Sequence, residues 1–487
     1  MIKCTRLIRM LSRLSLMSTL FISMPIHLHA QIPNEAFQSF EKSQNRQANQ
    51  SNQDHQSNQA NQSNQGDQKK QVWGRVASRN FYSTDNSKAF NSPDVLISFV
   101  ETDLSAKNIS SQKLDLEIDG TFILDMTQAK ERRFGETERL DQFRQFSLAK
   151  KIGHLKLTLG RKVIFSAGNA WVDGLDASYQ WAQKKATLGF YAGLSPDRFD
   201  RSFTLNYQAS GVYFDWQSDQ FNFSLAYNTI FFQKALDRHY AFQRMHFQLL
   251  KNLFVSNYLV LELIKGPSTS TWLSALDYTP IKGLNFALHV TRYSLEQYRN
   301  QFIYRNIIEP NQALILGNEV INLVYQRIRF SASMTLGAGF YHYHAIEFKN
   351  RAQDGRNAWL YVIGIRNDDF LGKKIEFDLQ AQVVNHFRSD TLLFALTLRK
   401  EVLQSFFLEG RATSFSGRTL DQNTDRARIF DESQQIYLLG ITSTYRFNQA
   451  HHFDLAYDGV FETELNDLKN NQNIVIHTGM FRYNYLF

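Results

Sequence analysis

Charged side chains recur at every second position in several short segments of this 487-residue chain. Alternate residues of a β-strand point to the same side, so each set would form one charged face. Fixed charges on such a face can sort ions and hydrogen-bond hydrophilic solutes, as rings of side chains do in pores. The plainer alternative is that these residues pair with one another and keep an interior wet. The acidic candidates are Asp115, Glu117, Asp119, Glu376 and Asp378, and the basic candidates are Lys156, Arg244, Arg329, Arg399, Arg411 and Arg482.

Two histidine pairs are the other residues whose spacing could support chemistry. They are His342 with His344, and His451 with His452. Such pairs could bind a metal ion or transfer protons. Histidines at strand spacing without further ligands define no closed site, and the tyrosines beside His342 suit a membrane interface. The chain also lacks the His-x-Ser-x-Gly pattern of a barrel phospholipase. We therefore expect no metal, no cofactor and no enzymatic activity.

The segments that carry the charged candidates have the pattern of β-strands. Residues 114–122 and 375–383 alternate apolar and polar side chains, as a strand with two unlike faces does. Aromatic residues make up 14% of the chain and there are only 7 prolines, a composition that favours strands. Past residue 30, no apolar run is long enough for a membrane-spanning helix. The sequence therefore predicts an all-β protein.

Half-buried strands also occur in soluble sandwiches, but three features favour a membrane barrel. The segments are about 9–11 residues long, which matches a tilted crossing of the hydrocarbon layer. Short turns alternate with longer polar loops, which we expect near residues 126–141, 195–201, 294–318, 339–356 and 415–434. The last segment is aromatic. We predict a single large antiparallel transmembrane β-barrel of roughly 18–22 strands, an even number that brings both ends to one side.

The final segment carries aromatic residues on one face, namely Phe481, Tyr483, Tyr485 and Phe487. This arrangement resembles the outer-membrane barrels that close on an aromatic C-terminal strand. The resemblance implies that these four residues form the signal read by the outer-membrane barrel assembly machinery. It also implies that the protein resides in the cell outer membrane of a Gram-negative bacterium.

The first 71 residues differ from the rest of the chain. Four basic residues precede an apolar stretch that ends at Ala30, the pattern of a cleaved signal peptide over residues 1–30. The Gln/Asn-rich segment 31–71 is too polar to bury a core, so we expect a disordered periplasmic segment there, with the barrel at 72–487. Cleavage would remove the only cysteine, Cys4, and lower the net charge of +8 by four, which argues against nucleic acid as a partner.

One hairpin carries a more specific pattern. Residues 159–165 read Leu-Gly-Arg-Lys-Val-Ile-Phe, and residues 168–177 read Gly-Asn-Ala-Trp-Val-Asp-Gly-Leu-Asp-Ala. This run is similar to porin-like barrels of the alginate-export type, although Lys162 stands where many relatives carry Gln. The resemblance implies that Arg161, Asp173 and Asp176 lie at or near a loop that narrows the pore. The alternative is ordinary turn chemistry at Asp173 and a loop-edge charge at Arg161.

These observations predict a porin-like outer-membrane channel for passive diffusion of hydrophilic solutes of an anionic or carbohydrate-like kind. Charges in the lumen and loops folded inward would select the solute without energy coupling. The alternative is a structural or adhesive barrel whose long outer loops bind a partner while the lumen stays closed. The expected partners are outer-membrane lipid and lipopolysaccharide, the assembly machinery and a small hydrophilic solute.

Overall fold

The computed structural model describes seven stretches of the chain. They are residues 71–85, 95–109, 114–125, 142–294 (without 182, 184, 198–200 and 265), 324–419 (without 353, 354, 387 and 388), 433–464 and 474–487. All of them belong to one compact unit, Lys69–Phe487. The predicted signal peptide, the Gln/Asn-rich segment up to residue 70 and the loops at 126–141, 295–323 and 420–432 lie outside the described residues.

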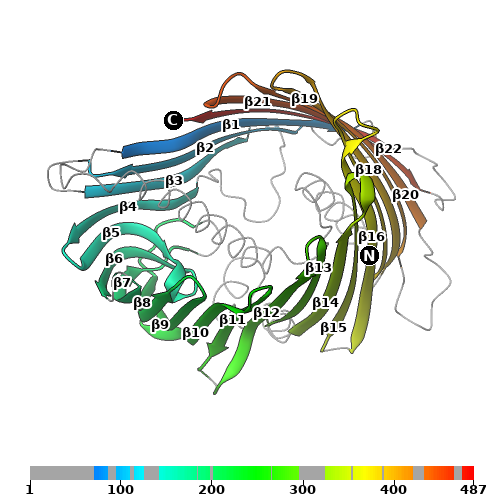
Figure 1. Ribbon diagram of the computed structural model, residues 1–487. Helices are drawn as coiled ribbons and strands as arrows, with labels where there is room; N and C mark the ends of the chain where they lie inside the picture. Colours follow the sequence, from blue (N-terminus) through cyan, green and yellow to red (C-terminus); the bar gives the residue numbers. More distant parts are fainter. Residues whose placement is uncertain are drawn as a thin grey trace, which may run out of the picture. The chain divides into compact units, whose positions relative to one another are not determined.

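The described residues form 22 β-strands, which follow one another around a ring (Figure 1). Two short 3₁₀ turns, η1 (Phe165–Ala167) and η3 (Gly337–Gly339), accompany them. The strands are β1 (Gln71–Asp85), β2 (Val95–Lys107), β3 (Leu114–Asp125), β4 (Gln142–Ile152), β5 (Leu155–Ile164), β6 (Ala170–Trp181), β7 (Ala186–Leu194), β8 (Tyr207–Gln217), β9 (Phe221–Phe232), β10 (Ala235–Leu250), β11 (Leu253–Glu262), β12 (Ser268–Ile281), β13 (Leu284–Ser294), β14 (Val324–Thr335), β15 (Phe340–Arg351), β16 (Arg356–Phe370), β17 (Ile375–His386), β18 (Ser389–Leu403), β19 (Phe406–Thr419), β20 (Ser433–Arg446), β21 (His451–Glu464) and β22 (Ile474–Leu486).

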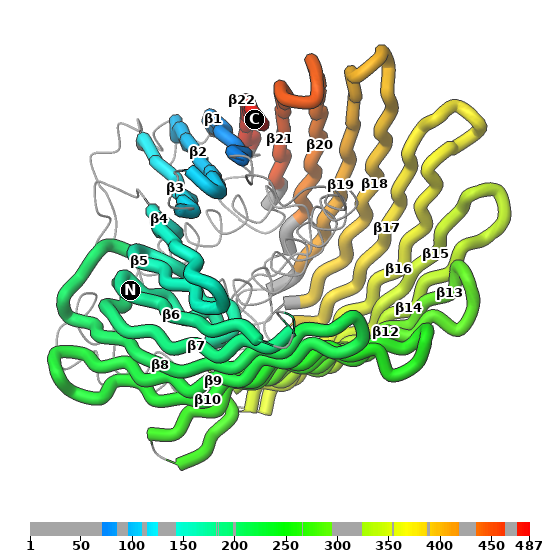
Figure 2. The backbone as a smooth tube through the Cα atoms, turned by 60° about the vertical axis from the view of Figure 1, so that its left-hand side comes forward, coloured from blue at the N-terminus to red at the C-terminus, as the bar shows by residue number. Residues whose placement is uncertain are grey.

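The sheet closes on itself. Every strand pairs antiparallel with the next in sequence, and β1 also pairs with β22 in a register that runs from Arg75↔Leu486 to Asp85↔Ile476. Figure 2 shows the same succession of neighbouring strands from another side. Closure leaves no edge strand with unpaired backbone groups, which is the condition for a sheet to cross a membrane. The prediction of a single large antiparallel barrel with an even number of strands is confirmed.

The connections differ between the two ends of the barrel. At the end that holds Gln71 and Phe487 they are short, and the longest of them is 108–113. The opposite end carries the long ones, among them 126–141, 195–206 and 295–323. This is the asymmetry of barrels with short periplasmic turns and long outer loops.

One predicted loop is wrong. Residues 339–356 were expected to form a long polar connection, but 340–351 are strand β15. The turn before it is tight, because Ala338 and Gly339 adopt positive φ angles of 57° and 76°. The polar residues of β15 misled the prediction since they include Lys349 and Glu347, which face the charged inner side of the barrel rather than a loop.

The strands have two unlike faces. On β14, Ile328 and Phe330 are 50% and 45% exposed, and they alternate with Arg327 and Arg329 on the other face. Exposed apolar side chains of this kind recur on most other strands, with Leu124, Leu159, Leu188 and Leu455 among the most exposed. An apolar outer band is what lipid contact requires, and a ring of 22 strands is too wide for its own wall side chains to fill.

Candidate functional site

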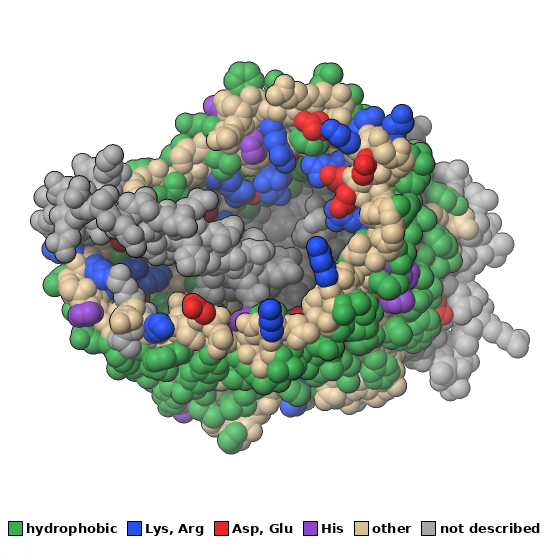
Figure 3. Space-filling model, in the orientation of Figure 1, with side chains coloured by type: hydrophobic (Ala, Val, Ile, Leu, Met, Phe, Trp, Pro, Cys, Tyr) green, Lys and Arg blue, Asp and Glu red, His purple; other side chains and the backbone are tan. Residues whose placement is uncertain are grey.

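The inner wall is the surface that could contact a solute. In Figure 3, hydrophobic side chains cover the outer wall in view, whereas basic and acidic side chains gather along the inside and the rim. Strand alternation causes this segregation. On β17, for example, Glu376 and Asp378 alternate with the outward Phe377 and Leu379. Wall residues of both charge signs are therefore the candidate site.

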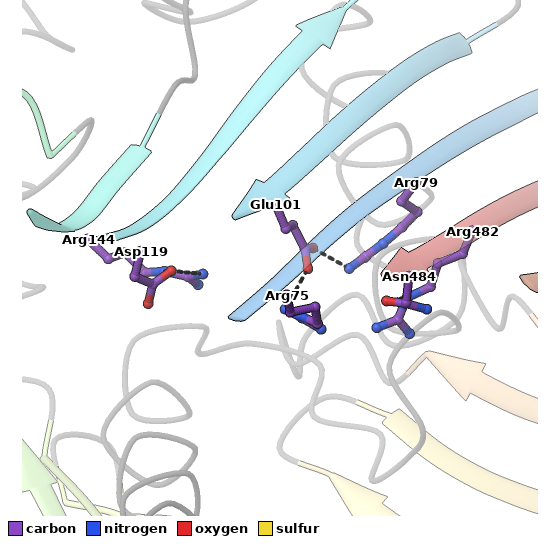
Figure 4. A network of polar contacts seen from close by, with 7 residues as sticks. All are labelled: Arg75, Arg79, Glu101, Asp119, Arg144, Arg482 and Asn484. Atoms are coloured by element: carbon purple, nitrogen blue, oxygen red, sulfur yellow. Dashed lines mark hydrogen bonds and ion pairs between the residues drawn. The ribbon is translucent and has the colours of Figure 1, made fainter. Parts of the chain in front are cut away.

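Arginines from the closing strands converge on one carboxylate of β2 (Figure 4). Glu101 accepts a hydrogen bond from Arg75 at 3.0 Å and another from Arg79 at 2.6 Å. Arg482, a predicted candidate on β22, lies opposite Arg79 in register and donates to Asn484 at 3.2 Å. Two arginines share one glutamate here, so this part of the wall has a surplus of positive charge.

The predicted acidic residues of β3 lie together on the next part of the wall. Asp119 accepts two hydrogen bonds from Arg144 on β4, at 3.0 Å and 2.7 Å (Figure 4). Glu117 accepts a hydrogen bond from Gln145, and Asp115 accepts one from a backbone amide at 3.1 Å. Among the described residues, Asp119 pairs with Arg144 while Asp115 and Glu117 form no salt bridge, so β3 carries a surplus of negative charge.

The patterned hairpin β5–β6 begins at a line of three glycines that are aligned across β5, β6 and β7. Gly160 pairs with Gly174, and Gly174 pairs with Gly193. Gly160 has a φ of +121°, and a Cβ there would lie 2.3 Å from the carbonyl oxygen of Phe146. A Cβ on Gly174 would lie 2.3 Å from the carbonyl oxygen of Ala192. Only glycine permits so close a backbone approach, and we call this line the glycine crease.

Arg161 and Asp173 form the next pair beyond the crease. The guanidinium group binds the carboxylate at two points, Nε to Oδ1 and Nη2 to Oδ2, both at 2.6 Å. Nη1 of Arg161 also donates to the carbonyl oxygens of Phe143 at 2.9 Å and Arg201 at 2.6 Å. The two side chains are only 12% and 10% exposed. Arg161 therefore joins the hairpin to β4 and to the connection before β8.

Asp176 and Lys156 occupy the same hairpin in different surroundings. Asp176 is 2% exposed, and its two oxygens contact Lys162 Nζ and the Tyr213 hydroxyl, each at 2.8 Å. Lys156 lies opposite Ser178 on the same face of the hairpin and forms no ion pair with any described residue. Lys162, which departs from the resembling pattern, is thus the counterion of Asp176.

The tip of this hairpin packs against the inner side of the barrel wall. The turn η1 contacts β8 and β9, and a Cβ on Gly168 would lie 2.8 Å from the ring of Phe242 on β10. Phe242 shares its strand face with the basic residue Arg244, and it is 1% exposed. Ala167 at the tip is fully buried. The hairpin therefore covers an apolar part of the inner wall.

Arg244 lies deep in a buried polar group below this contact. Its Nη2 donates to Ser224 at 3.1 Å and lies 3.8 Å from Asp215, and Ser224 donates to Asp215 at 2.5 Å. Nearby, Arg238 donates to Glu262 through Nε at 2.8 Å and Nη2 at 2.5 Å. Both arginine side chains therefore bind acidic or polar partners on neighbouring strands of the wall.

The cluster around Glu347 is different, since three basic side chains surround one carboxylate. Glu347 is completely buried, and its Oε1 lies 3.0 Å from Lys349 Nζ. Its Oε2 lies 3.6 Å from Arg329 and 3.8 Å from Arg327. These distances are longer than charge-assisted hydrogen bonds, so the arginines are held near the carboxylate by charge. The cluster has a surplus of positive charge on the inner wall.

The remaining predicted basic residues lie on β18 and β19. Arg399 is 3.7 Å from Glu376 and lies over the ring of Phe407. Arg411 is 3.1 Å from Asp458 on β21 and 3.6 Å from Glu409. The predicted Asp378 accepts a hydrogen bond from the hydroxyl of Tyr343 at 3.0 Å. These acidic and basic residues are therefore mostly paired.

The aromatic residues of the last strand lie at the closing seam. Phe487 exchanges two backbone hydrogen bonds with Gly74, at 2.9 Å and 3.1 Å. A Cβ on Gly74 would lie 2.8 Å from the ring of Phe487, so the ring fits only because residue 74 is glycine. Tyr485 stacks on Phe487, and Phe481 is 42% exposed on the same face. The hydroxyl of Tyr483 hydrogen-bonds His451 at 2.8 Å.

The sequence analysis missed several charged residues of the inner wall, although they also lie on strands that alternate apolar and polar side chains. Arg327 stands two positions before the predicted Arg329, and Arg75 and Arg79 occupy the inner face of β1. Lys349 and Glu347 were missed because their strand was taken for a loop. Extending the alternating segment of β14 by one residue toward its start would have found Arg327.

Across the described strands and turns, no group of three or more His, Cys, Asp or Glu residues could hold a metal ion. His342 and His344 contact each other edge to face at 4.8 Å and no third ligand joins them there. In the same residues, no helix is long and apolar enough to cross a membrane.

A closed barrel with an apolar outer wall and a charged inner wall belongs to the class of transmembrane β-barrels. No protein-family model matches the chain, and no curated protein is detectably similar to it. Among solved structures it is similar to Pseudomonas aeruginosa OccK11 (OpdR), with 10% identity, a TM-score of 0.43 and coverage of 85% of this chain and 96% of that one.

Two further structures are similar to the same extent. The Pseudomonas aeruginosa outer membrane protein opdK has 7% identity, a TM-score of 0.42 and coverage of 86% of this chain and 99% of that one. Acinetobacter baumannii OccAB2 has 7% identity, a TM-score of 0.43 and coverage of 85% and 98%. Identities and TM-scores this low assign neither a family nor a solute to this chain.

Proposed function

We propose that this protein is an outer-membrane channel for passive diffusion of small hydrophilic solutes. The observation that carries the proposal is a closed 22-stranded ring whose outer face is apolar and whose inner face is charged. A ring of this size has room for an aqueous interior, and the side chains on its wall would replace part of the hydration of a passing solute. No covalent step, energy source or cofactor is needed.

We further propose that the solutes are anionic and carbohydrate-like. Support comes from the cluster of Arg327, Arg329 and Lys349 around Glu347, which leaves positive charge on the wall. Beside it Tyr293 and Tyr325 pair in register and stack with ring centroids 5.0 Å apart, on the same strand face as Arg327. Guanidinium groups bind carboxylates, and flat aromatic rings suit the apolar faces of sugars.

The hairpin β5–β6 would narrow the lumen, as its resemblance to alginate-export barrels implies. Its tip rests on the inside of the wall near Phe242, and the pair Arg161–Asp173 holds its base. In this proposal Arg161 and Asp173 position the hairpin, and Lys156 contacts the solute. The resemblance covers this hairpin and, loosely, the barrel pattern of residues 72–487, and membership of the alginate-export class is part of the proposal.

Single-channel recording in planar bilayers tests the channel. Refolded protein should give discrete, reproducible conductance steps, and the reversal potential in a KCl gradient should indicate preference for the anion. Barrels that are folded, as judged by heat-modifiable migration, but never conduct would rule out passive diffusion. A preference for the cation would be consistent with a channel but would contradict the proposal that its solutes are anionic.

The second candidate is an adhesive or structural barrel whose outer loops bind a partner. The long connections 126–141, 295–323 and 420–432 all lie at the end opposite Gln71, which favours this candidate as an additional role. A barrel that binds a partner but does not conduct would favour adhesion over diffusion.

A further inference from the structure

A row of polar side chains crosses the outer face of β12 to β16 near the end with the long connections. In register, Trp272 pairs with Arg292 and Arg292 pairs with Gln326. Gln326 pairs with Asn350, and Asn350 pairs with Asn357. Because paired residues point to the same side of a sheet, the side chains form one continuous row. We call Arg292, Gln326, Asn350 and Asn357 the outward polar row.

The outward polar row marks the edge of the apolar band. Two residues nearer the short-turn end, the corresponding outward residues are Val290, Ile328, Phe348 and Trp359. The last three are 50%, 47% and 45% exposed. On the other side of the row, β13 ends at Ser294 and β15 ends at Arg351. The row therefore lies where hydrocarbon gives way to the head groups of the outer leaflet, with Trp272 and Trp359 as interface aromatics.

Arg292 has an unusual environment in this row. Its Nε is buried and has no hydrogen-bond partner, and its side chain forms no ion pair with any described residue. An arginine at the lipid boundary is costly unless an anion or water satisfies it. The neighbouring amides are available as well, since Gln326 and Asn357 are exposed, and Asn350 donates to Asn357 at 2.8 Å. The row thus combines one unpaired cation with several amide donors and acceptors.

We propose that the outward polar row binds the phosphorylated sugar head group of an outer-leaflet glycolipid. Arg292 would bind the phosphate with its planar donor fork, and the amides of the neighbouring strands would hydrogen-bond the sugar hydroxyls. A second copy of the barrel is a poorer occupant, because a two-fold contact would bring two Arg292 side chains together. The site lies on the lipid side of the wall and is independent of whether the lumen conducts.

The test is lipid binding by the full-length barrel in nanodiscs. Native mass spectrometry would compare doubly phosphorylated lipid A, dephosphorylated lipid A and phosphatidylglycerol as added lipids. We expect the phosphorylated lipid A to bind best, and Arg292→Ala to weaken it by about tenfold, the loss of one charge-assisted contact. Lys251→Ala, which removes a cation from the exposed turn at the opposite end, should leave binding unchanged.

A double variant of the exposed amides, Gln326→Ala with Asn357→Ala, separates the sugar from the phosphate. It should weaken lipid A binding and spare phosphatidylglycerol. Equal binding of all three lipids by the wild-type barrel would overturn the site, and so would an Arg292→Ala variant that folds and binds lipid A as the wild type does. A wild-type dimer that resists added lipid A would assign the row to a second copy instead.

Discussion

Arginines on the wall fall into two groups according to what their guanidinium groups touch. Arg161 and Arg144 make close hydrogen bonds to carboxylates, between 2.6 and 3.0 Å, and these bonds occupy much of their donor capacity. Arg327 and Arg329 stand 3.8 and 3.6 Å from the same glutamate, beyond the length of a charge-assisted hydrogen bond. The first group stabilises the wall. The second group is the one that can respond to a passing anion.

Asp173→Asn tests the stabilising group. The substitution leaves Arg161 without its charged partner at a site only 10–12% exposed, so we expect a loss of about 3 kcal/mol in unfolding free energy. Urea titration of the refolded barrel in lipid measures it. Asp368→Asn is the matched control, since the pair Arg366–Asp368 is 51% and 73% exposed and should change stability by less than about 0.5 kcal/mol. Equal losses in both variants would contradict the structural role of Arg161.

Glu347→Gln tests the responsive group. It removes the one negative charge among Arg327, Arg329 and Lys349, so the proposed channel should become more selective for anions. The reversal potential in a KCl gradient at low ionic strength, where screening is weak, measures the change. Asp219→Asn removes a negative charge from an exposed turn outside the wall and serves as the control. A shift toward cations in Glu347→Gln would refute the role of the cluster.

At the scale of elements, the hairpin β5–β6 shows how backbone constraints place side chains. At the glycine crease β5 approaches β4, and β6 approaches β7, more closely than a Cβ allows, and the hairpin beyond it reaches β8, β9 and Phe242. Gly168 then fills the contact beside the buried Ala167, because a Cβ at position 168 would collide with the ring of Phe242. The motif Leu-Gly-Arg and its partner Asp-Gly-Leu thus encode a bend.

Gly174→Ala tests the crease. The added methyl group would meet the carbonyl oxygen of Ala192 at 2.3 Å, so the strands must separate and we expect a loss of about 2 kcal/mol. Hydrogen exchange of residues 160–175 should rise at the same time. Gly410→Ala is the control, because nothing lies within 4 Å of a Cβ there, and it should cost nothing or stabilise by up to about 1 kcal/mol. Unchanged exchange in Gly174→Ala would mean that the hairpin does not depend on the crease.

At the scale of the whole molecule, the barrel depends on the seam between β1 and β22. This contact joins the two ends of the sheet, and without it both strands would present open edges to lipid. At one end of this seam, Gly74 and Phe487 exchange two backbone hydrogen bonds, and the ring of Phe487 packs over the glycine. Closure of the barrel therefore depends in part on the aromatic residue Phe487.

Phe487→Ala tests this coupling together with the proposed assembly signal. We expect less folded barrel in the outer membrane of an expressing cell, because the variant loses the ring over Gly74 and the stacking on Tyr485. Heat-modifiable migration of membrane fractions measures the folded amount. Phe461→Ala on β21 is the control, since it removes a ring of 40% exposure, close to the 43% of Phe487, away from the seam. Comparable folding of the two variants would argue against a special role for the last residue.

The sequence alone determined the class of fold, the approximate number of strands and the alternation of the wall, because period-2 patterning is local and survives without knowledge of neighbours. It also identified the hairpin whose glycines form the crease. Asp176 shows its limit: the sequence placed it at or near a loop that narrows the pore, but it could not show that Asp176 is buried against Lys162 and Tyr213.

Only the tertiary structure decided which charges meet. Glu347 acquires its three cations from β14 and β15, and Glu101 acquires its two from β1, through registers that the sequence does not display. The inner apolar face around Phe242 is also a tertiary result, because covering by a hairpin that comes from another part of the chain makes burial favourable there. Alternation is a property of one strand, whereas pairing and covering depend on how strands are aligned across the closed ring.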